Sequence, residues 1–347
     1  MSPYPSLGKG QIDQLFLAYT GYSIGTDGTP HYQFWEPGDF LPLLTHTDPS
    51  TGCPDGSMFT DFLFLALGIL NDNGEGRILT RDEKKPANWN EWLRYMNELF
   101  LCDRNLDALC QAVRCSPLCR INVWIALPYP NPQIFPDDKL RVQAVTDWMC
   151  LFLDRWSCQS WNDCLQLQGF YWLQESLYFR GPENDDRLVI QTVNQEIHAC
   201  KHGGHRLRSI WIPYQKANGW NEWETLGFDL AFLQPNTYFN PQKSLEDAAA
   251  DAYAYGMGLE IEFDLGVTYD KAKRERLRAY LQAGETGGSD LQGRSFSPYM
   301  YEAPIAWYTG GWFFGKNGRK QAVVSLYQSN DPLYDEIYRF INGVAEL

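Results

Sequence analysis

The sequence predicts an α/β fold, a single (β/α)8 TIM barrel. Short, nearly continuous apolar runs recur along the chain, and amphipathic helical patterns lie between them. Continuous apolar runs are typical of strands that are covered on both faces, as in a parallel sheet. Repeated alternation of strand and helix then favours a closed barrel. Because no internal repeat, low-complexity tract or linker-like stretch interrupts it, residues 1–347 are expected to form one domain.

Eight runs have the composition and length of barrel strands, and six segments have helical spacing of apolar residues. The expected strands are Leu15–Tyr19, Phe62–Leu67, Ile121–Leu127, Leu165–Trp172, Ser209–Pro213, Phe228–Gln234, Gly258–Phe263 and Pro304–Tyr308. The expected helices are Asn88–Arg114, Leu140–Trp156, Arg187–His202, Ser244–Tyr255, Tyr269–Leu281 and Asp331–Val344. Ser244, at the start of the helix expected over Ser244–Tyr255, has Asp247 three residues later, which is the spacing of an N-terminal cap.

Two loops depart from the regular pattern. Thr20–Met58 is rich in Gly, Pro and Thr without a clear helix, so we expect a long irregular insertion with its own hairpin between the first two strands. Together with Gly284–Ser297 it is expected to shape the cleft. A doubly wound open sheet is the alternative fold, but Thr20–Gly25 does not match the Gly-rich phosphate turn that such a sheet would need.

Composition excludes several classes of partner. The net charge is −14, so the chain offers no basic patch for nucleic acid or anionic lipid, and a strongly anionic polymer is a less favoured substrate. No apolar run has the length of a membrane span. The first residues contain no signal-like stretch, which predicts a cytoplasmic protein as written; a trimmed form of a secreted or periplasmic protein would look the same.

The cysteines do not have zinc-site spacing, whereas His198 and His202 share a helix face that could suggest zinc but lie in the wrong part of the barrel. The nine cysteines contain no CxxC pair and are expected to be mostly reduced and buried. His198–His205 precedes the fifth strand, which places it at the opposite end of the barrel from an active site, and Gly203-Gly204 is expected to cap a helix. Asp61 and Asp229 open strands and are expected to be structural. No metal or other cofactor is predicted.

Carboxylates are placed where a barrel enzyme carries its chemistry. In Gly258–Asp264 the side chains alternate, so Glu260 and Glu262 share one face of a strand, and Glu175 directly follows the fourth strand. Active sites of these barrels lie at the carboxyl ends of the strands. Two carboxylates on separate strand ends are what glycosidic-bond cleavage requires.

We therefore expect a glycoside hydrolase. Glu175 is assigned as the general acid/base, with its pKa raised by aromatic neighbours and by a second carboxylate. Glu262 is assigned as the nucleophile, or as the base if the gap between the two is wide. Glu260 is expected to position Glu262 or to bind a sugar hydroxyl.

Further polar and aromatic residues sit at other strand ends, and aromatics make up 15% of the chain. Flat aromatic rings match the apolar faces of sugars, and amides bind their hydroxyls. The expected substrate-binding residues, for an oligo- or polysaccharide, are Glu260, Tyr19, Tyr129, Trp172, Trp211, Tyr214, Gln234, Asn236 and Trp307.

Several blocks of the chain resemble a known family. They are Phe59–Leu67, Ile125–Pro130, Gly169–Glu175, Trp211–Tyr214, Gln234–Asn236 and Gly256–Phe263. The resemblance is to a bacterial domain-of-unknown-function family of glycosidase-like barrels, and it implies a (β/α)8 fold with a carbohydrate role. More distantly, the layout is similar to the clan of retaining barrel glycosidases, which implies an acid at Glu175 and a nucleophile at Glu262. That clan usually has Asn before the acid, whereas this chain has Gln174, which puts the retaining outcome in doubt.

Two other functions stay open. A non-catalytic barrel would bind a glycan in the same cleft without releasing product. A barrel lyase or isomerase would hold a divalent metal through Glu260, Glu262 and Asp264, although no Lys or His at a strand end supports it.

Overall fold

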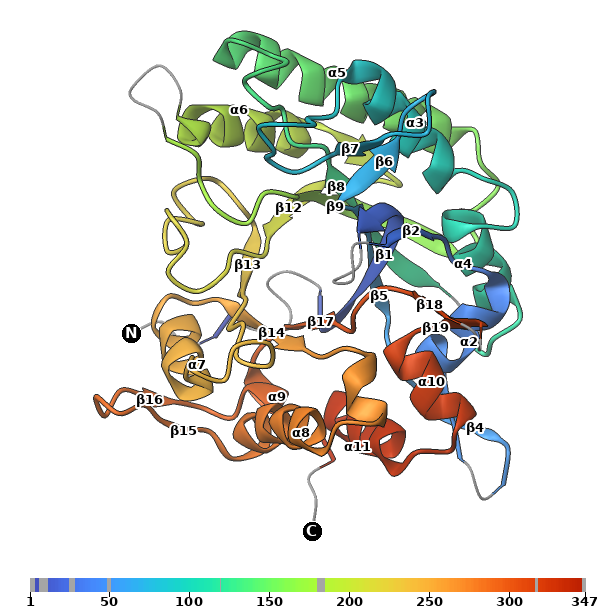
Figure 1. Ribbon diagram of the computed structural model, residues 1–347, viewed down its shortest axis with the longest axis vertical. Helices are drawn as coiled ribbons and strands as arrows, with labels where there is room; N and C mark the ends of the chain where they lie inside the picture. Colours follow the sequence, from blue (N-terminus) through green and yellow to red (C-terminus); the bar gives the residue numbers. More distant parts are fainter. Residues whose placement is uncertain are drawn as a thin grey trace.

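The chain folds into a closed barrel of eight parallel strands ringed by helices (Figure 1). The computed structural model describes residues 4–5, 12–24, 29–48, 51–118, 120–179, 185–315 and 318–344. The barrel strands are β1 (Gln14–Ile24), β5 (Asp61–Ala66), β8 (Ile121–Leu127), β9 (Leu165–Trp172), β12 (Arg208–Trp211), β13 (Leu230–Leu233), β14 (Gly258–Glu262) and β17 (Ile305–Tyr308). Because β1 pairs with both β5 and β17, the sheet closes on itself. The predicted fold class and all eight strand positions are confirmed.

Helices cover the outside of the barrel, as the ribbon in Figure 1 shows. They are α2 (Pro37–Leu44), α3 (Trp89–Leu99), α4 (Asn105–Arg114), α5 (Asp138–Ser157), α6 (Asp186–Ala199), α7 (Leu245–Ala254), the 3-10 helix η1 (Leu265–Thr268), α8 (Lys271–Thr286), α9 (Tyr299–Glu302), α10 (Ala322–Gln328) and α11 (Pro332–Ile341). The segment 212–229, between β12 and β13, contains turns in place of a helix.

Short strands decorate the barrel. Three of them extend the sheet beside β1: β2 (Pro30–Gln33), β6 (Gly68–Leu70) and β7 (Gly76–Ile78). The others form four separate hairpins: β3 (Thr45–Thr47) with β4 (Pro54–Ser57), β10 (Lys201–His202) with β11 (His205–Arg206), β15 (Gly288–Ser289) with β16 (Ser295–Phe296), and β18 (Phe313–Gly315) with β19 (Gly318–Lys320).

The register between β14 and β17 decides which side chains face the barrel interior. Glu260 lies beside Ala306 and Glu262 beside Tyr308, whereas Ile261 lies beside Trp307. Alternate residues of a strand point to opposite faces. The two glutamates and Tyr308 therefore share a face, and Trp307 lies on the other one, where its ring packs against Phe340 of α11.

The prediction of one helix over Asn88–Arg114 is wrong, because the chain forms α3 and α4 there. Asp103 and Asn105 adopt the left-handed backbone region, with φ of 59° and 47°, which a helix cannot accommodate. The Asn105 side chain stabilises the break, since its amide donates to the Glu98 carbonyl at 2.9 Å. The apolar periodicity of both helices runs on in phase, which hides the break in the sequence.

The prediction that Thr20–Met58 lacks a helix is also wrong. β1 continues to Ile24, and α2 begins at Pro37, a residue that is well tolerated in the first turn because its missing N–H needs no partner there. The expected hairpin is present as β3 and β4. The sequence pattern likewise missed α10, which precedes the last helix.

The structure changes the interpretation of Gly203-Gly204. Helix α6 ends at Ala199, and the two glycines, both with positive φ, form the turn between β10 and β11 rather than a helix cap. The His198 ring donates from Nε2 to the Asp229 carboxylate at 2.8 Å, and Asp229 also accepts from the Ser209 N–H. These contacts are structural, as expected for the far end of the barrel.

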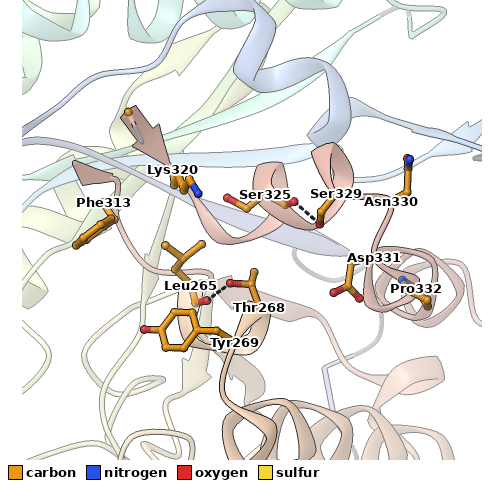
Figure 2. A pocket seen from close by; sticks show the side chains of 11 residues that line it. Leu265, Thr268, Tyr269, Phe313, Lys320, Ser325, Ser329, Asn330, Asp331 and Pro332 are labelled. Carbon is orange, nitrogen blue, oxygen red and sulfur yellow. Dashed lines mark hydrogen bonds between the residues drawn. The ribbon is translucent and has the colours of Figure 1, made fainter. Parts of the chain in front are cut away.

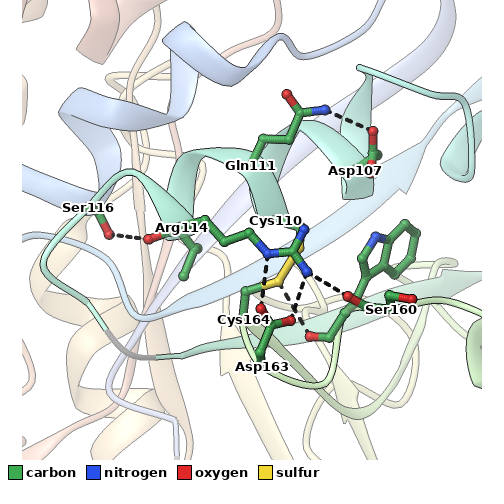
Figure 3. Close-up of a disulfide and its surroundings, with 10 residues drawn as sticks. Asp107, Cys110, Gln111, Arg114, Ser116, Ser160, Asp163 and Cys164 are labelled. Atoms are coloured by element: carbon green, nitrogen blue, oxygen red, sulfur yellow. Dashed lines mark hydrogen bonds and ion pairs between the residues drawn. A yellow bond between two sulfur atoms is a disulfide. The ribbon is translucent and has the colours of Figure 1, made fainter.

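The cysteines are less buried than predicted. Cys110 of α4 and Cys164, just before β9, form a disulfide that crosses 54 residues of sequence (Figure 3). Of the other described cysteines, five are exposed: Cys53, Cys102, Cys115, Cys150 and Cys158. The helix and loop positions they occupy face outward. Cys119 lies outside the described residues.

Among the described residues, no helix is both long enough and apolar enough to cross a bilayer.

Candidate active site

Three carboxylates come together at the carboxyl end of the barrel. Glu260 and Glu262 lie on β14 with 2% and 0% of their surfaces exposed, and Glu175 follows the end of β9. The charge of Glu262 raises the pKa of Glu175, and the charges of both raise the pKa of Glu260. Residues that are far apart in sequence thus form one electrostatic unit.

A pocket of about 440 Å³ opens above this cluster. It lies at the ends of β1, β9, β13 and β17, with a loop after β7 forming one wall. The lining residues are Tyr19, Leu67, Thr80, Arg81, Leu173, Gln174, Glu175, Gln234, Phe239 and Tyr308. Glu175 is partly exposed in this pocket, whereas Glu260 and Glu262 lie buried below it.

Glu262 is held by polar contacts on one of its oxygens. Tyr280 of α8 donates its hydroxyl to Oε2 of Glu262 at 2.7 Å. The Gln234 side chain and the Asn236 backbone also favour the ionised carboxylate. The other oxygen, Oε1, has no hydrogen-bond partner among the described residues. A buried carboxylate oxygen without a partner is costly, so this one is available to a ligand or a proton.

Burial raises the pKa of all three carboxyl groups. The pKa of Glu175 rises to about 7 through burial and then through the charge of Glu262. The pKa of Glu262 also rises to about 7 through burial, against the lowering effect of Tyr280, Gln234 and Asn236. Groups with such a pKa exchange protons near neutrality, which is what acid–base chemistry needs.

Glu260 behaves differently from its neighbour. Burial, Glu262 and Glu175 all raise its pKa, well above the ordinary value of 4.5, and its Oε2 has no partner among the described residues. Without donors to stabilise a charge, this carboxyl group is the one that stays protonated. The hydroxyls of Tyr19 and Tyr308 lie in the same electrostatic environment, since burial first, and then the charges of Glu260 and Glu175, raise the pKa of both.

The loop that carries Glu175 is anchored on both sides. The Trp211 indole donates to the Gln174 carbonyl at 2.8 Å, and the Gln174 side chain accepts the Arg81 N–H at 2.8 Å. Gln174, which departs from the Asn of the similar clan, therefore binds the neighbouring wall of the pocket. These bonds fix the direction in which Glu175 enters the pocket.

Part of the predicted binding set lies at this site. Tyr19 and Gln234 line the pocket, and the backbone of Asn236, with φ of 58°, stabilises Glu262. Glu260 lies beneath the pocket. Tyr214 does not line the pocket; it is 37% exposed, and its ring lies 6.0 Å from the Lys243 ammonium.

The structure does not bring the other predicted aromatics to the pocket lining. Trp172, Trp211 and Trp307 are buried on the opposite strand face from the glutamates, where Trp211 stacks on Phe228 and the Trp307 indole donates to Gln14 at 2.7 Å. Tyr129 bonds Asp186 at 3.1 Å, within a buried network with Arg141. These positions indicate packing and anchoring roles.

Sequence reasoning missed Tyr308, Phe239, Arg81 and Tyr280. Tyr308 could have been found from the sequence, because it follows Trp307 and alternation along the strand places it on the same face as the glutamates. Arg81 and Phe239 lie in irregular loops, and Tyr280 reaches Glu262 from a helix, so no local pattern marks them.

The residues of the alternative metal site do not converge. Asp264 accepts from the Tyr238 hydroxyl at 2.8 Å and from the Lys273 ammonium at 2.8 Å, and it caps η1. Within the described part of the chain, two groups of potential ligands lie close together, and both are away from β14: Cys110, Asp163 and Cys164, and Cys102, Asp103 and Asp107. Two members of the first group are in the disulfide.

A larger pocket of about 630 Å³ lies outside the carboxylate site (Figure 2). Its walls are η1 with Tyr269 after it, the β18–β19 hairpin, and the end of α10 with the turn to α11. Its residues include Tyr269, Phe313, Lys320 and Asp331, and none of the predicted site residues. Size alone does not select a site, because the titratable cluster lies elsewhere.

The chain was compared with protein-family models and with curated proteins. No curated protein matches the chain. A family model described as a domain of unknown function, DUF4855, matches residues 15–340, from the first barrel strand to the last helix. The chain therefore belongs to the family of the domain of unknown function DUF4855.

Proposed function

We propose that this protein is a glycoside hydrolase in which Glu175 is the general acid/base and Glu262 is the nucleophile. The observation that carries the proposal is the electrostatic pairing of Glu175, which lines the pocket, with Glu262, which is buried next to it, each with a pKa of about 7. A glycosidase needs one carboxyl group protonated and the other ionised at the same pH.

The surroundings favour a division of labour. Glu175 faces the pocket, and burial and the charge of Glu262 both favour its protonated form, so it holds the proton and delivers it to the glycosidic oxygen. Tyr280, Gln234 and Asn236 favour the ionised form of Glu262, which then attacks the anomeric carbon. In the second step Glu175 takes a proton from water, the water oxygen bonds to the anomeric carbon, and the bond from that carbon to Glu262 breaks, which frees the sugar.

Glu260 is the weaker candidate for the nucleophile. It lies one layer deeper on β14, and burial, Glu262 and Glu175 all raise its pKa and so disfavour its charged form. As a protonated group it would donate a hydrogen bond to Glu262 or to a sugar hydroxyl.

The experiment is hydrolysis of a panel of polysaccharides and aryl glycosides, measured as released reducing sugar or phenol. We expect Glu175→Gln and Glu262→Gln each to lower kcat at least about 100-fold on any accepted substrate. Glu246→Gln, an exposed change on α7, is the matched control. Full activity in either site variant would remove that residue from the mechanism. Proton NMR of the first-formed anomer distinguishes the retaining from the inverting outcome.

A non-catalytic glycan-binding barrel is the second candidate, and the complete burial of Glu262 favours it. Such a protein would bind a glycan without releasing product, and Glu175→Gln would leave binding unchanged. A glycan that binds in a titration and is recovered intact after long incubation would support this function over hydrolysis.

A further inference from the structure

Arg81 brings a positive charge into the wall of the carboxylate pocket. It lines the same pocket as Glu175 and Tyr308, and its side chain is exposed. This is an unusual position in a chain with 29 cationic and 43 acidic side chains, where a cation readily finds an acidic partner.

The guanidinium of Arg81 has no carboxylate in ion-pair contact within the described ranges. The neighbouring arginines differ in this respect. Arg77 pairs with Glu75 at 2.8 Å, and Arg94 pairs with Asp72. The charge of Arg81 is thus available to an anion that enters the pocket.

Two contacts hold Arg81 in its position. Its backbone N–H donates to the Gln174 side chain at 2.8 Å, which ties it to the residue before Glu175. Its guanidinium lies 4.8 Å from the centre of the Tyr178 ring, a cation–π contact that restricts the side chain. Both contacts come from the loop after β9, so Arg81 and Glu175 are held in a common frame.

We propose that Arg81 recognises an anionic substituent, a carboxylate or a sulfate ester, on the sugar whose linkage Glu175 addresses. This inference rests on the proposed function and narrows it to acidic glycans. A guanidinium presents parallel N–H donors that match the two oxygens of such a group, which an ammonium does not. The site then differs locally from the net charge of −14, which by itself argues against an anionic substrate.

The test measures binding and hydrolysis separately. Binding is titrated calorimetrically to Glu175→Gln, with oligosaccharides of polygalacturonate and alginate as uronic-acid probes, carrageenan oligosaccharides as sulfated probes, and laminarin and xylan oligosaccharides as neutral probes. The same titrations are made with Arg81→Gln and Arg81→Lys added to that background. Arg77→Gln, four residues away and outside the pocket lining, removes an equal charge as the control.

We expect at least one acidic probe to bind more tightly than the neutral ones, and Arg81→Gln to lower its affinity at least about 10-fold. Arg81→Lys should recover part of that loss, and Arg77→Gln should have little effect. Binding through Arg81 should also weaken between 20 and 300 mM NaCl, roughly the range over which exposed charges are screened. The class of probe that responds distinguishes a carboxylate from a sulfate.

Either hypothesis can fail alone. If a neutral glycan is bound or hydrolysed best and Arg81→Gln does not change the preference, the inference is overturned while hydrolysis stands. If an acidic glycan binds through Arg81 but the wild-type protein never cleaves it, hydrolysis fails and recognition by Arg81 stands.

Discussion

Glu262 combines two opposing influences, burial that favours its neutral form and the Tyr280 hydroxyl that favours its charge. A nucleophile must be ionised to attack, so the balance between them sets the acid limb of activity.

We therefore expect Tyr280→Phe to move the acid limb of the kcat/KM profile to higher pH. The substitution removes a hydrogen bond that lowers the pKa of Glu262, so its ionised fraction at a given acidic pH falls. A kcat/KM loss of about 10-fold below pH 6 should shrink toward higher pH, because a shift of one pKa unit changes the ionised fraction by that factor. A pH–rate profile of wild type and variant checks this, with Tyr327→Phe as a control for loss of a phenol elsewhere. An unchanged acid limb would contradict the assigned role of Glu262.

A second prediction for a single residue concerns Glu260 and the pH dependence of stability. Its folded-state pKa is raised above the unfolded value, so its contribution to stability is fully present below about pH 4.5 and is lost as pH rises through the folded pKa. Glu260→Gln, which imitates the protonated form, avoids this loss.

The free energy of unfolding of wild type should fall relative to Glu260→Gln by up to about 1.4 kcal/mol per pH unit above pH 4.5. Urea titrations at several pH values measure the difference, with Glu246→Gln as the exposed control. Parallel curves for wild type and Glu260→Gln would show that Glu260 is not a protonated buried acid.

At the scale of elements, the loop after β9 matters most because it carries Glu175. It is fixed by the Trp211 indole, by Arg81 and by Asp186, whose carboxylate accepts the Tyr178 N–H at 2.9 Å and pairs with the buried Arg141. Asp186 lies in the first turn of α6. The loop that carries Glu175 is therefore attached to the helical layer as well as to the barrel.

The disulfide is the corresponding constraint at the opposite end of the β9 strand. The disulfide joins α4 to Cys164. Beside it, the Arg114 guanidinium donates bidentate hydrogen bonds to the Asp163 carboxylate, at 3.0 and 2.9 Å (Figure 3). A crosslink that closes a loop of 54 residues removes conformational entropy from the unfolded chain.

Replacing both cysteines, as Cys110→Ala with Cys164→Ala, should lower the free energy of unfolding by about 4 kcal/mol. Urea unfolding of both proteins, with and without dithiothreitol, makes the measurement. The reductant should destabilise wild type and leave the double variant unchanged. Equal sensitivity in both proteins would show that the crosslink is not formed.

At the scale of the whole molecule, the net charge of −14 disfavours the compact state through self-repulsion. The described surface ion pairs oppose this weakly, because exposed pairs contribute little each. Screening by salt should therefore stabilise the folded state, because it weakens the self-repulsion more than it weakens the ion pairs. We expect the melting temperature to rise by roughly 2 °C between 10 and 150 mM NaCl, the equivalent of about 1 kcal/mol for a chain of this size. A scanning fluorimetry series checks it, and a steady fall with salt would mean that ion pairs dominate.

The sequence by itself determined the order of strands and helices, because strand burial on both faces and helical periodicity are local properties of the chain. All eight barrel strands lie where the apolar runs predict, and Glu260 and Glu262 share a face because side chains alternate along β14. The placement of Glu175 at the pocket follows from the same strand-end rule.

Only the tertiary structure decided which strand ends meet and which face of each strand opens to the pocket. Trp172, Trp211 and Trp307 sit at strand ends but one residue out of phase with the inward face, so they pack outward. Tyr280 from α8 and Arg81 from an irregular loop reach the site through closure of the barrel, a long-range event with no local sequence signal. The physical reason is that periodicity fixes a side chain relative to its own element, whereas packing between elements fixes it relative to the site.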